Sequence, residues 1–338
     1  MTRLPIWHSA LEVPAELGET AVSIGNYDGV HRGHRFVLDQ LRRHAEARSL
    51  SPVALTFWPH PRHVMGSPEA TPLLTGHEDR ERLLLLAGLH GVLDLEFTLD
   101  FARHSPEEFV RIFLVEGLRA KCVVLGEDAL FGRANAGNID TMRELGEKYG
   151  FEVVTAPDLG PEGTGTGRIS SSGIRRDLLA GDVRAANEAL GRLHTVTDEI
   201  HHGFRRGRAL GFPTANLGPR PQGLIPADGV YAGYATVTAQ DPSHAGDEPL
   251  AGAPATISIG TNPTFEADGA PRRTVEAYVL GDHDLHLYGD TVRLEFVEFQ
   301  RPTLKFDSID ALVEQMAEDV EVTRRTLVAE RSRSDLGS

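Results

Sequence analysis

The strongest constraint on the fold is a change in secondary-structure pattern near Arg192, in a chain of 338 residues. Before this point, short apolar runs alternate with stretches of helical periodicity. After it, apolar runs follow one another with only turn-rich segments between them. The first pattern predicts a parallel sheet covered by helices on both faces, and the second predicts a small antiparallel β-barrel. Because the chain is also too long for one ordinary core, we predict two domains, 1–190 and 191–338.

The first domain is predicted to be a doubly wound, Rossmann-like α/β domain. Its predicted strands are Ala21–Ile24, Val53–Phe57, Val92–Leu95, Cys122–Leu125 and Glu152–Thr155. Its predicted helices are His34–Arg48, Asp79–Leu89, Pro106–Glu116, Asn138–Tyr149, Ser170–Ala180 and Val183–Leu190. The strands predicted for the barrel are Thr195–His201, Val230–Val237, Thr256–Ile259, Thr274–Leu280 and Thr291–Phe299, with a final helix over Asp307–Glu330.

Charge and composition exclude several classes of function. The formal net charge is -15, which argues against nucleic-acid binding, because a basic surface supplies most of that affinity. Small anionic ligands are not excluded. The single cysteine, Cys122, lies in an apolar run and cannot form an internal disulfide, as expected for a reducing compartment. The longest aliphatic patch, Leu83–Ala87, is far shorter than a membrane span of about 20 residues. We therefore expect a cytoplasmic protein without membrane or nucleic-acid partners; a homo-oligomer is left open.

The first chemical motif is the segment Gly25-Asn26-Tyr27-Asp28-Gly29-Val30-His31-Arg32-Gly33-His34, which follows a predicted strand and opens a helix. Glycines in such a turn let backbone N–H groups approach a polyphosphate. Two histidines three residues apart on a first helical turn can reach one phosphate and stabilise charge that develops on it. We predict His31 and His34 as catalytic residues. The predicted phosphate-binding residues of this segment are Gly25, Asn26, Asp28, Gly29 and Gly33.

A second phosphate-binding element is predicted at Ser170, Ser171 and Ser172, with Arg175, predicted as a catalytic residue, one helical turn later. Hydroxyl groups and unpaired N–H groups at a helix start, together with an arginine, can hold phosphate oxygens. One of the serines is also expected to cap the helix. Three serines and Arg175 exceed what capping alone requires.

The most specific stretch of the chain is His202–Leu217, which combines glycines, arginines and two hard oxygen donors. Its predicted nucleotide-binding residues are Gly203, Arg206, Arg208, Gly211 and Pro213. Thr214 and Asn216 are two residues apart on an extended segment, so their side chains project to the same side. Such oxygens suit Mg²⁺, which shares its ligands with nucleotide phosphates. We predict Thr214 and Asn216 as Mg²⁺ ligands and ATP as the co-substrate.

These motifs resemble those of the bacterial bifunctional riboflavin kinase/FAD synthetase family. The first motif is similar to the family's GNFDGVHRGH opening, and Gly203–Leu217 is similar to its GxxRGRxLGFPTANL motif. Further similar segments follow in the family's order: Thr56–Pro61, Ser105–Val110, Gly126–Gly132, Ile169–Arg175, Pro226–Gly233, Ile259–Phe265 and Leu287–Gly289. The resemblance covers nearly the whole chain.

The resemblance implies two ATP-dependent reactions. Riboflavin would be phosphorylated to FMN in the barrel domain, with Glu276 as the base that activates the ribityl hydroxyl. FMN would then be adenylylated to FAD in the first domain, with release of pyrophosphate. The partners implied are riboflavin, FMN, FAD and ATP. The flavin-binding residues implied are Asp128, Phe131 and Arg301.

The chain departs from the family pattern at Trp58 and at Ala129-Leu130, near the expected acceptor pocket. Two alternatives therefore stay open: a single-activity paralogue, and a flavin-binding protein without turnover. Retention of His31, His34, Thr214, Asn216 and Glu276 argues against the second, because binding alone does not require all five. The remaining histidines, His194 among them, show no zinc-like spacing, and we predict most of them on the surface.

Overall fold

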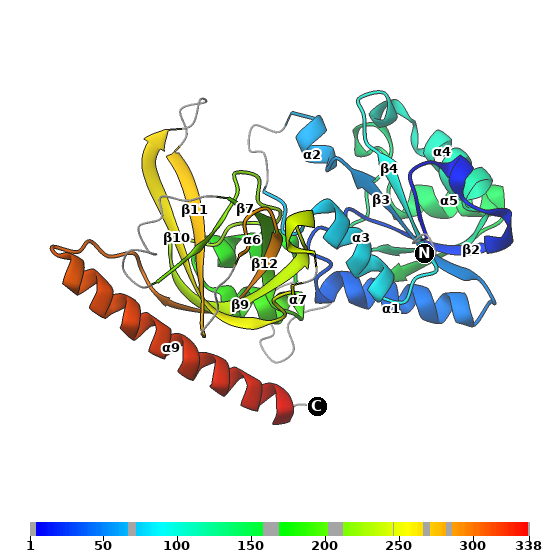
Figure 1. Cartoon of the computed structure of the whole chain (residues 1–338). Coiled ribbons are helices and arrows are strands. Elements are labelled where there is room, and N and C mark those ends of the chain that lie inside the picture. Colours follow the sequence, from blue (N-terminus) through cyan, green and yellow to red (C-terminus); the bar gives the residue numbers. More distant parts are fainter. Residues whose placement is uncertain are drawn as a thin grey trace. The chain divides into compact units, whose positions relative to one another are not determined.

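The chain forms two compact units in a computed structural model, shown in Figure 1. Residues 5–66, 72–157, 169–201, 212–245, 247–265, 271–281 and 286–336 are described. The first unit comprises Met1–Pro72 and His77–Ser171, and the second comprises Leu73–Gly76 and Ser172–Ser338.

The first unit is built on a six-stranded parallel sheet. Its strands are β1 (Ile6–Trp7), β2 (Thr20–Ile24), β3 (Ser51–Trp58), β4 (Gly91–Glu96), β5 (Ala120–Gly126) and β6 (Glu152–Ala156). The strand order is β1-β4-β3-β2-β5-β6. From β2 the chain adds β3 and β4 on one side and then crosses over to add β5 and β6 on the other side, so the strand order reverses beside β2. Ligands of such sheets bind beyond the carboxyl ends of the strands at this switch point.

Helices cover both faces of this sheet, as predicted. The α-helices of the unit are α1 (Arg32–Glu46), α2 (Pro61–Val64), α3 (His77–Leu86), α4 (Pro106–Phe109) and α5 (Ile139–Tyr149), and α4 continues as a π-helical segment, Val110–Gly117. Short 3₁₀ turns occur at Ala10–Glu12, Ala15–Leu17, Phe101–Arg103 and Arg133–Asn135. Val22 and Val53 belong to one buried cluster and their neighbours Ala21 and Ala54 to another. Adjacent strand residues point to opposite faces, so both faces are apolar and buried.

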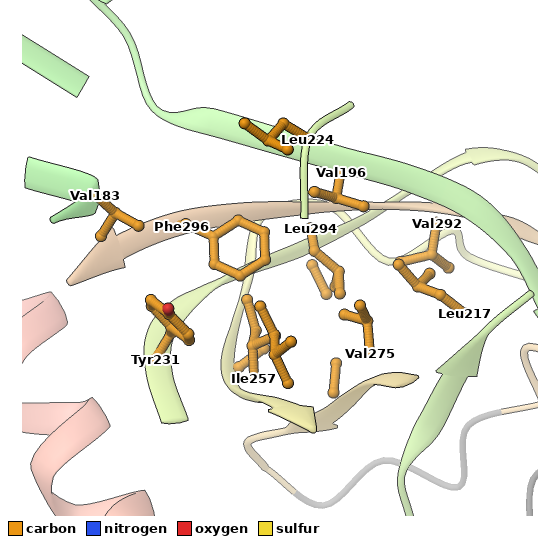
Figure 2. Close-up of a cluster of buried hydrophobic side chains, with 14 of the residues drawn as sticks. Val183, Val196, Leu217, Leu224, Tyr231, Ile257, Val275, Val292, Leu294 and Phe296 are labelled. Carbon is orange, nitrogen blue, oxygen red and sulfur yellow. The ribbon is translucent and has the colours of Figure 1, made fainter. Parts of the chain in front are cut away.

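The second unit contains a closed six-stranded antiparallel barrel. Its strands are β7 (His194–His201), β8 (Ala215–Leu217), β9 (Gly229–Ala239), β10 (Ala253–Phe265), β11 (Pro271–Val279) and β12 (Thr291–Arg301), in the order β10-β11-β8-β7-β12-β9. Figure 2 shows the barrel interior, where Tyr231, Ile257 and Phe296 are fully buried. A 3₁₀ turn lies at Pro242–His244, and a long helix, α9 (Ile309–Leu336), follows the barrel. The predicted barrel and final helix are confirmed; the short strands β1 and β8 were not predicted.

Two helices precede the barrel and pack with it. They are α6 (Ser171–Leu179) and α7 (Val183–Leu190). Their apolar residues Ile174, Leu178 and Ala186 belong to the same buried cluster as barrel residues such as Phe296. The structural units therefore divide at Ser171 and Ser172, whereas the sequence-based boundary lies between 190 and 191. Helical periodicity shows which face of α6 and α7 is apolar, but not which core that face joins.

His194 is buried at the start of β7 rather than on the surface. Its Nε2 atom lies 2.7 Å from the carbonyl oxygen of Leu224, and its backbone N–H donates to the Asn187 side chain at 2.7 Å. Burial lowers the pKa of His194 to about 4 from the ordinary value of 6.5. At neutral pH the folded barrel therefore contains His194 as the neutral imidazole.

We expect the barrel to lose stability as the pH falls from about 6.5 towards 4, because there the unfolded chain binds a proton at His194 that the folded chain excludes. Above the pKa that His194 has in the unfolded chain, this loss is absent. The full effect on the free energy of unfolding is about 3 kcal/mol, since one pKa unit corresponds to about 1.4 kcal/mol. Calorimetric unfolding of the parent and His194→Gln at pH 7 and pH 5 measures it. The parent should lose more stability than the variant over this interval. Equal losses would contradict the assignment.

Candidate functional sites

The first site begins in the loop after β2, at the switch point of the sheet. Tyr27 and Val30 have φ of 50° and 39°, and Gly29 has φ of 87°, so the turn uses the left-handed region three times. The Tyr27 ring is buried, its hydroxyl donates to Ser23 Oγ at 2.8 Å, and burial raises the pKa of Tyr27. A Cβ atom at Gly25 would lie 3.0 Å from this ring. Glycine at 25 therefore lets Tyr27 fold under the loop and fix its shape.

The loop delivers His31 and His34 to the N-terminus of α1. His31 is the N-cap of this helix, and its Nδ1 accepts the backbone N–H of His34 at 3.2 Å. The two imidazole rings are stacked, with centroids 3.6 Å apart and an interplanar angle of 16°. Because Nδ1 of His31 accepts a hydrogen bond, its ring proton lies on Nε2. The structure thus brings the two predicted catalytic histidines together where a helix N-terminus favours an anion.

Gly33 allows a second segment to approach the histidines. A Cβ atom at this position would lie 3.1 Å from the His31 ring and 3.3 Å from the carbonyl oxygen of Ile169. Ser171, two residues after Ile169, donates its hydroxyl to the carbonyl oxygen of Asp28 at 2.9 Å. The predicted serine segment is therefore attached to the predicted phosphate loop. Ser170 is half-buried next to Ser171.

Other predicted residues of the first site have different surroundings. Asn26 and Ser172 are exposed, and Arg175 is buried on α6. Asp128 is exposed, whereas Phe131 is buried in the core of the first unit, where its ring centroid lies 6.0 Å from that of Phe109. A flavin that contacts Phe131 would therefore meet a ring that the core largely covers.

The second site lies on the barrel, where three predicted residues meet. Asn216 on β8 is the register partner of Glu276 on β11. The Thr214 hydroxyl donates to Glu276 Oε2 at 3.2 Å, and Asn216 Nδ2 lies 3.4 Å from Thr214 Oγ1. Glu276 is half-buried. Strand pairing thus places an acidic group beside both predicted metal ligands.

Two of these polar groups, Thr214 and Glu276, line a cavity of about 240 Å³. Its lining also includes aromatic residues, Arg301 and side chains of α9. Among these residues are Phe212, Tyr278, Arg301, Leu312, Met316, Asp319 and Val320. The rings of Phe212 and Tyr278 meet edge to face, with centroids 5.2 Å apart. A mostly apolar cavity with a few polar groups in its lining is a typical site for a small-molecule ligand.

Arg301 lines this cavity and is held by α9. Its Nε and Nη2 atoms donate to the two carboxylate oxygens of Asp319 at 2.7 and 2.6 Å. Such a bidentate pair fixes the guanidinium plane. Arg301, predicted to bind flavin, therefore connects the end of β12 to the helix that forms one wall. The predicted residues Gly203, Arg206, Arg208 and Gly211 lie outside the described residues, and Pro213 is exposed.

Comparison with known proteins identifies the family. A family model described as FAD synthetase matches residues 13–173, and one described as riboflavin kinase matches residues 190–327. A bifunctional riboflavin kinase/FMN adenylyltransferase of Listeria monocytogenes is 33% identical over 304 residues, which cover 90% of this chain and 91% of the relative. The chain belongs to the bifunctional riboflavin kinase/FMN adenylyltransferase family. Its activities are therefore the kinase and adenylyltransferase reactions that produce FMN and FAD.

Two further relatives of this family agree. The Escherichia coli K12 protein is 32% identical over 318 residues, covering 94% of this chain and 95% of the relative. The Bacillus subtilis protein is 31% identical over 324 residues, covering 94% and 96%. A solved structure described as a macrolide-efflux protein from Streptococcus pneumoniae is 29% identical, with a TM-score of 0.81, and covers 94% of this chain and 98% of that one. Among the described residues of this family member, no helix is long and apolar enough to span a bilayer.

The structure adds residues to both sites that were not among the predicted site residues. On the barrel these are Phe212, Tyr278, Met316 and Asp319. A signal for the last two existed, because Leu312, Met316, Asp319 and Val320 share one face of a helix. For the first site, Thr56 and Arg80 contact the loop backbone. Arg80 gives no such signal, because a charged residue on a helix is ordinarily predicted to face solvent.

Proposed function

We propose that the barrel site is the riboflavin kinase site and that Glu276 is its base. The observation that carries this proposal is the convergence of Thr214, Asn216 and Glu276, two of which, Thr214 and Glu276, line a mostly apolar cavity. The isoalloxazine ring would occupy the cavity against Tyr278 and the apolar residues of α9. Its ribityl chain would then reach Glu276, which lines the same cavity.

Phosphoryl transfer requires alignment, charge neutralisation and a proton acceptor. The ribityl 5′-oxygen forms a bond to the γ-phosphorus of ATP while the bond from that phosphorus to the β-γ bridging oxygen breaks. The hydroxyl proton passes to a Glu276 carboxylate oxygen, and ADP leaves. The Thr214 hydroxyl, which donates to Oε2 of Glu276, would hold the carboxylate in place for this transfer.

The donor set beside Glu276 fits Mg²⁺. The Thr214 hydroxyl lies within hydrogen-bond distance of both the Glu276 carboxylate and the Asn216 side-chain amide, and hard oxygen ligands of this kind are preferred by Mg²⁺. Thr214 and Asn216 would hold the ion. When bound, it would neutralise phosphate charge on the nucleotide.

We expect Thr214→Val to lower the rate of riboflavin phosphorylation at least about tenfold, because one oxygen ligand of the ion is lost. The Mg²⁺ concentration required for half-maximal activity should rise. The adenylyltransferase activity of the same protein should not change. Steady-state rates over a Mg²⁺ titration measure both effects. Thr238→Val on the exposed end of β9 is the matched control. An unchanged Mg²⁺ dependence in Thr214→Val would remove Thr214 from the ligand set.

We infer that the loop site of the first unit carries the adenylyl transfer. An FMN phosphate oxygen attacks the α-phosphorus of ATP, and the bond to the pyrophosphate oxygen breaks. His31 and His34 would donate hydrogen bonds to phosphate oxygens on which charge accumulates in the transition state. Ser170, Ser171, Ser172 and Arg175 would hold the nucleotide phosphates, together with the backbone of the Gly25–Gly33 loop.

Assays with each flavin supplied separately test both assignments in this chain. With ATP and Mg²⁺, riboflavin should give FMN and then FAD, and FMN alone should give FAD with release of pyrophosphate. Flavin products are separated chromatographically, and pyrophosphate is measured independently. FMN accumulation from riboflavin with no FAD from either substrate would assign the protein to a kinase-only function. Flavin binding without ATP consumption would exclude both reactions.

A further inference from the structure

A buried charged cluster lies beside the phosphate loop of the first unit. Arg80 on α3 and Asp94 on β4 are 3% and 1% exposed, and Arg80 Nη2 lies 3.0 Å from Asp94 Oδ2. His77 Nε2 lies 2.5 Å from the same oxygen and 3.5 Å from Glu81 Oε1. Burial raises the pKa of Glu81. A buried guanidinium without a charged partner would be strongly destabilising, so Asp94 provides the charge that allows Arg80 to lie inside.

This cluster has the donor types of a metal site, but its geometry is that of hydrogen bonding. His77, Glu81 and Asp94 could each offer a ligand atom. However, Asp94 Oδ2 already lies within hydrogen-bond distance of two donors, one of them the fixed cation Arg80. A second cation would have to displace or face this guanidinium. We therefore interpret the cluster as a hydrogen-bond network that holds the Arg80 guanidinium, and not as a metal site.

The contacts of Arg80 join the carboxyl ends of three adjacent strands. Its Nη2 reaches β4 through Asp94, while its Nη1 donates to the Phe57 carbonyl on β3 at 3.0 Å and to the Asn26 carbonyl after β2 at 3.4 Å. In the sheet, β4, β3 and β2 are neighbours. One planar group with several donors can make such connections, whereas an ammonium group cannot reproduce this fork.

The Asn26 carbonyl is a fixed point of the catalytic loop. The buried Thr56 hydroxyl also donates to it at 3.4 Å. Five residues later the chain reaches His31, and the Asp28 carbonyl between them accepts the Ser171 hydroxyl. A displacement of Asn26 would therefore move both the histidines and the serine segment.

We propose that Arg80 is a positioning residue for adenylyl transfer. It holds the backbone of the phosphate loop so that His31 and His34 meet the α-phosphate in the reactive arrangement. The inference rests on the proposed role of the two histidines. Arg80 acts through the carbonyl oxygens of Asn26 and Phe57, with Asp94 as the counter-charge that fixes its guanidinium.

The test uses Arg80→Lys and Arg80→Gln in the full chain, with Arg82→Gln as control, since Arg82 lies exposed on the same helix. Small misplacements of catalytic groups lower rates strongly, so we expect a loss of about 10- to 100-fold in the kcat for FMN to FAD. The KM for FMN should change little, because Arg80 orients the loop rather than the substrate. Arg82→Gln should match the parent, and kinase activity should be unchanged in all variants.

Folding of the first unit is followed in the same proteins. Both tryptophans of the chain, Trp7 and Trp58, lie in this unit, so tryptophan fluorescence during urea unfolding reports on it alone. Adenylyltransferase kcat within about twofold of the parent in both Arg80 variants would overturn the inference. If adenylyltransferase activity falls only in proportion to the folded fraction of the first unit, the role of Arg80 is purely structural. That result would also overturn the inference. An inactive parent would instead contradict the proposed function itself.

Discussion

Glu276→Gln is expected to abolish most riboflavin phosphorylation and to leave FAD synthesis from FMN intact. Loss of a general base lowers a rate by about 10²- to 10⁴-fold. Glutamine has the same shape and keeps an oxygen that can accept the Thr214 hydrogen bond, so the local geometry should persist. The measured quantity is kcat with saturating riboflavin and ATP. The KM for riboflavin should change much less, because the carboxylate contributes to the transition state more than to binding.

Glu295→Gln on strand β12 of the same barrel is the matched control for this experiment. It removes the same charge from a half-buried barrel position and should retain parental kinase activity. The adenylyltransferase rate of each variant provides a second control within the same molecule. A Glu276→Gln protein with full kinase activity would remove the proposed base, and the reaction would then need another proton acceptor.

Substitution of the stacked histidines is expected to have the second largest effect, on FAD formation. Removal of one transition-state hydrogen-bond donor typically lowers kcat by about 10²- to 10³-fold. His31 also caps α1, so His31→Ala would combine a catalytic loss with about 1 kcal/mol of lost capping. Asparagine is a good N-cap but has no imidazole. His31→Asn therefore separates the two roles.

We expect His31→Asn and His34→Gln to lose FMN adenylylation while tryptophan fluorescence shows a normally folded first unit. His44→Gln, near the other end of α1, should behave like the parent. Rates of pyrophosphate release from FMN and ATP measure the effect, and kinase activity should be unchanged. A double His31→Asn, His34→Gln protein that still forms FAD at the parental rate would exclude the histidines from catalysis.

The sequence predicted the class of both domains because each uses a different local pattern. Alternating strands and helices specify the parallel sheet, and strand ends such as Ile24 place the His31 motif at its carboxyl edge. The barrel was predictable from consecutive strands, but β8 was not, because three residues provide no periodicity. Its pairing with β11 is a tertiary interaction, yet it is what brings Asn216 opposite Glu276.

Long-range contacts of polar side chains could not be predicted from the sequence. Arg80 lies on a helix whose pattern predicts exposure for charged residues, and only the spatial neighbour Asp94 explains its burial. The connection of Ser171 to Asp28 spans 143 residues. Likewise, α6 and α7 show apolar faces in the sequence, but nothing local specifies that these faces join the barrel core.

The position of α9 in the chain has a consequence for biosynthesis. All residues of the first unit have been translated by Ser171, whereas the cavity wall formed by Leu312, Met316 and Val320 is among the later segments to leave the ribosome. At about 5–20 residues per second, domains fold in order of synthesis. The sheet that carries His31 and His34 can therefore be complete on a nascent chain before the flavin cavity of the barrel exists. Premature termination ahead of α9 would leave that sheet whole and the barrel cavity open on one side.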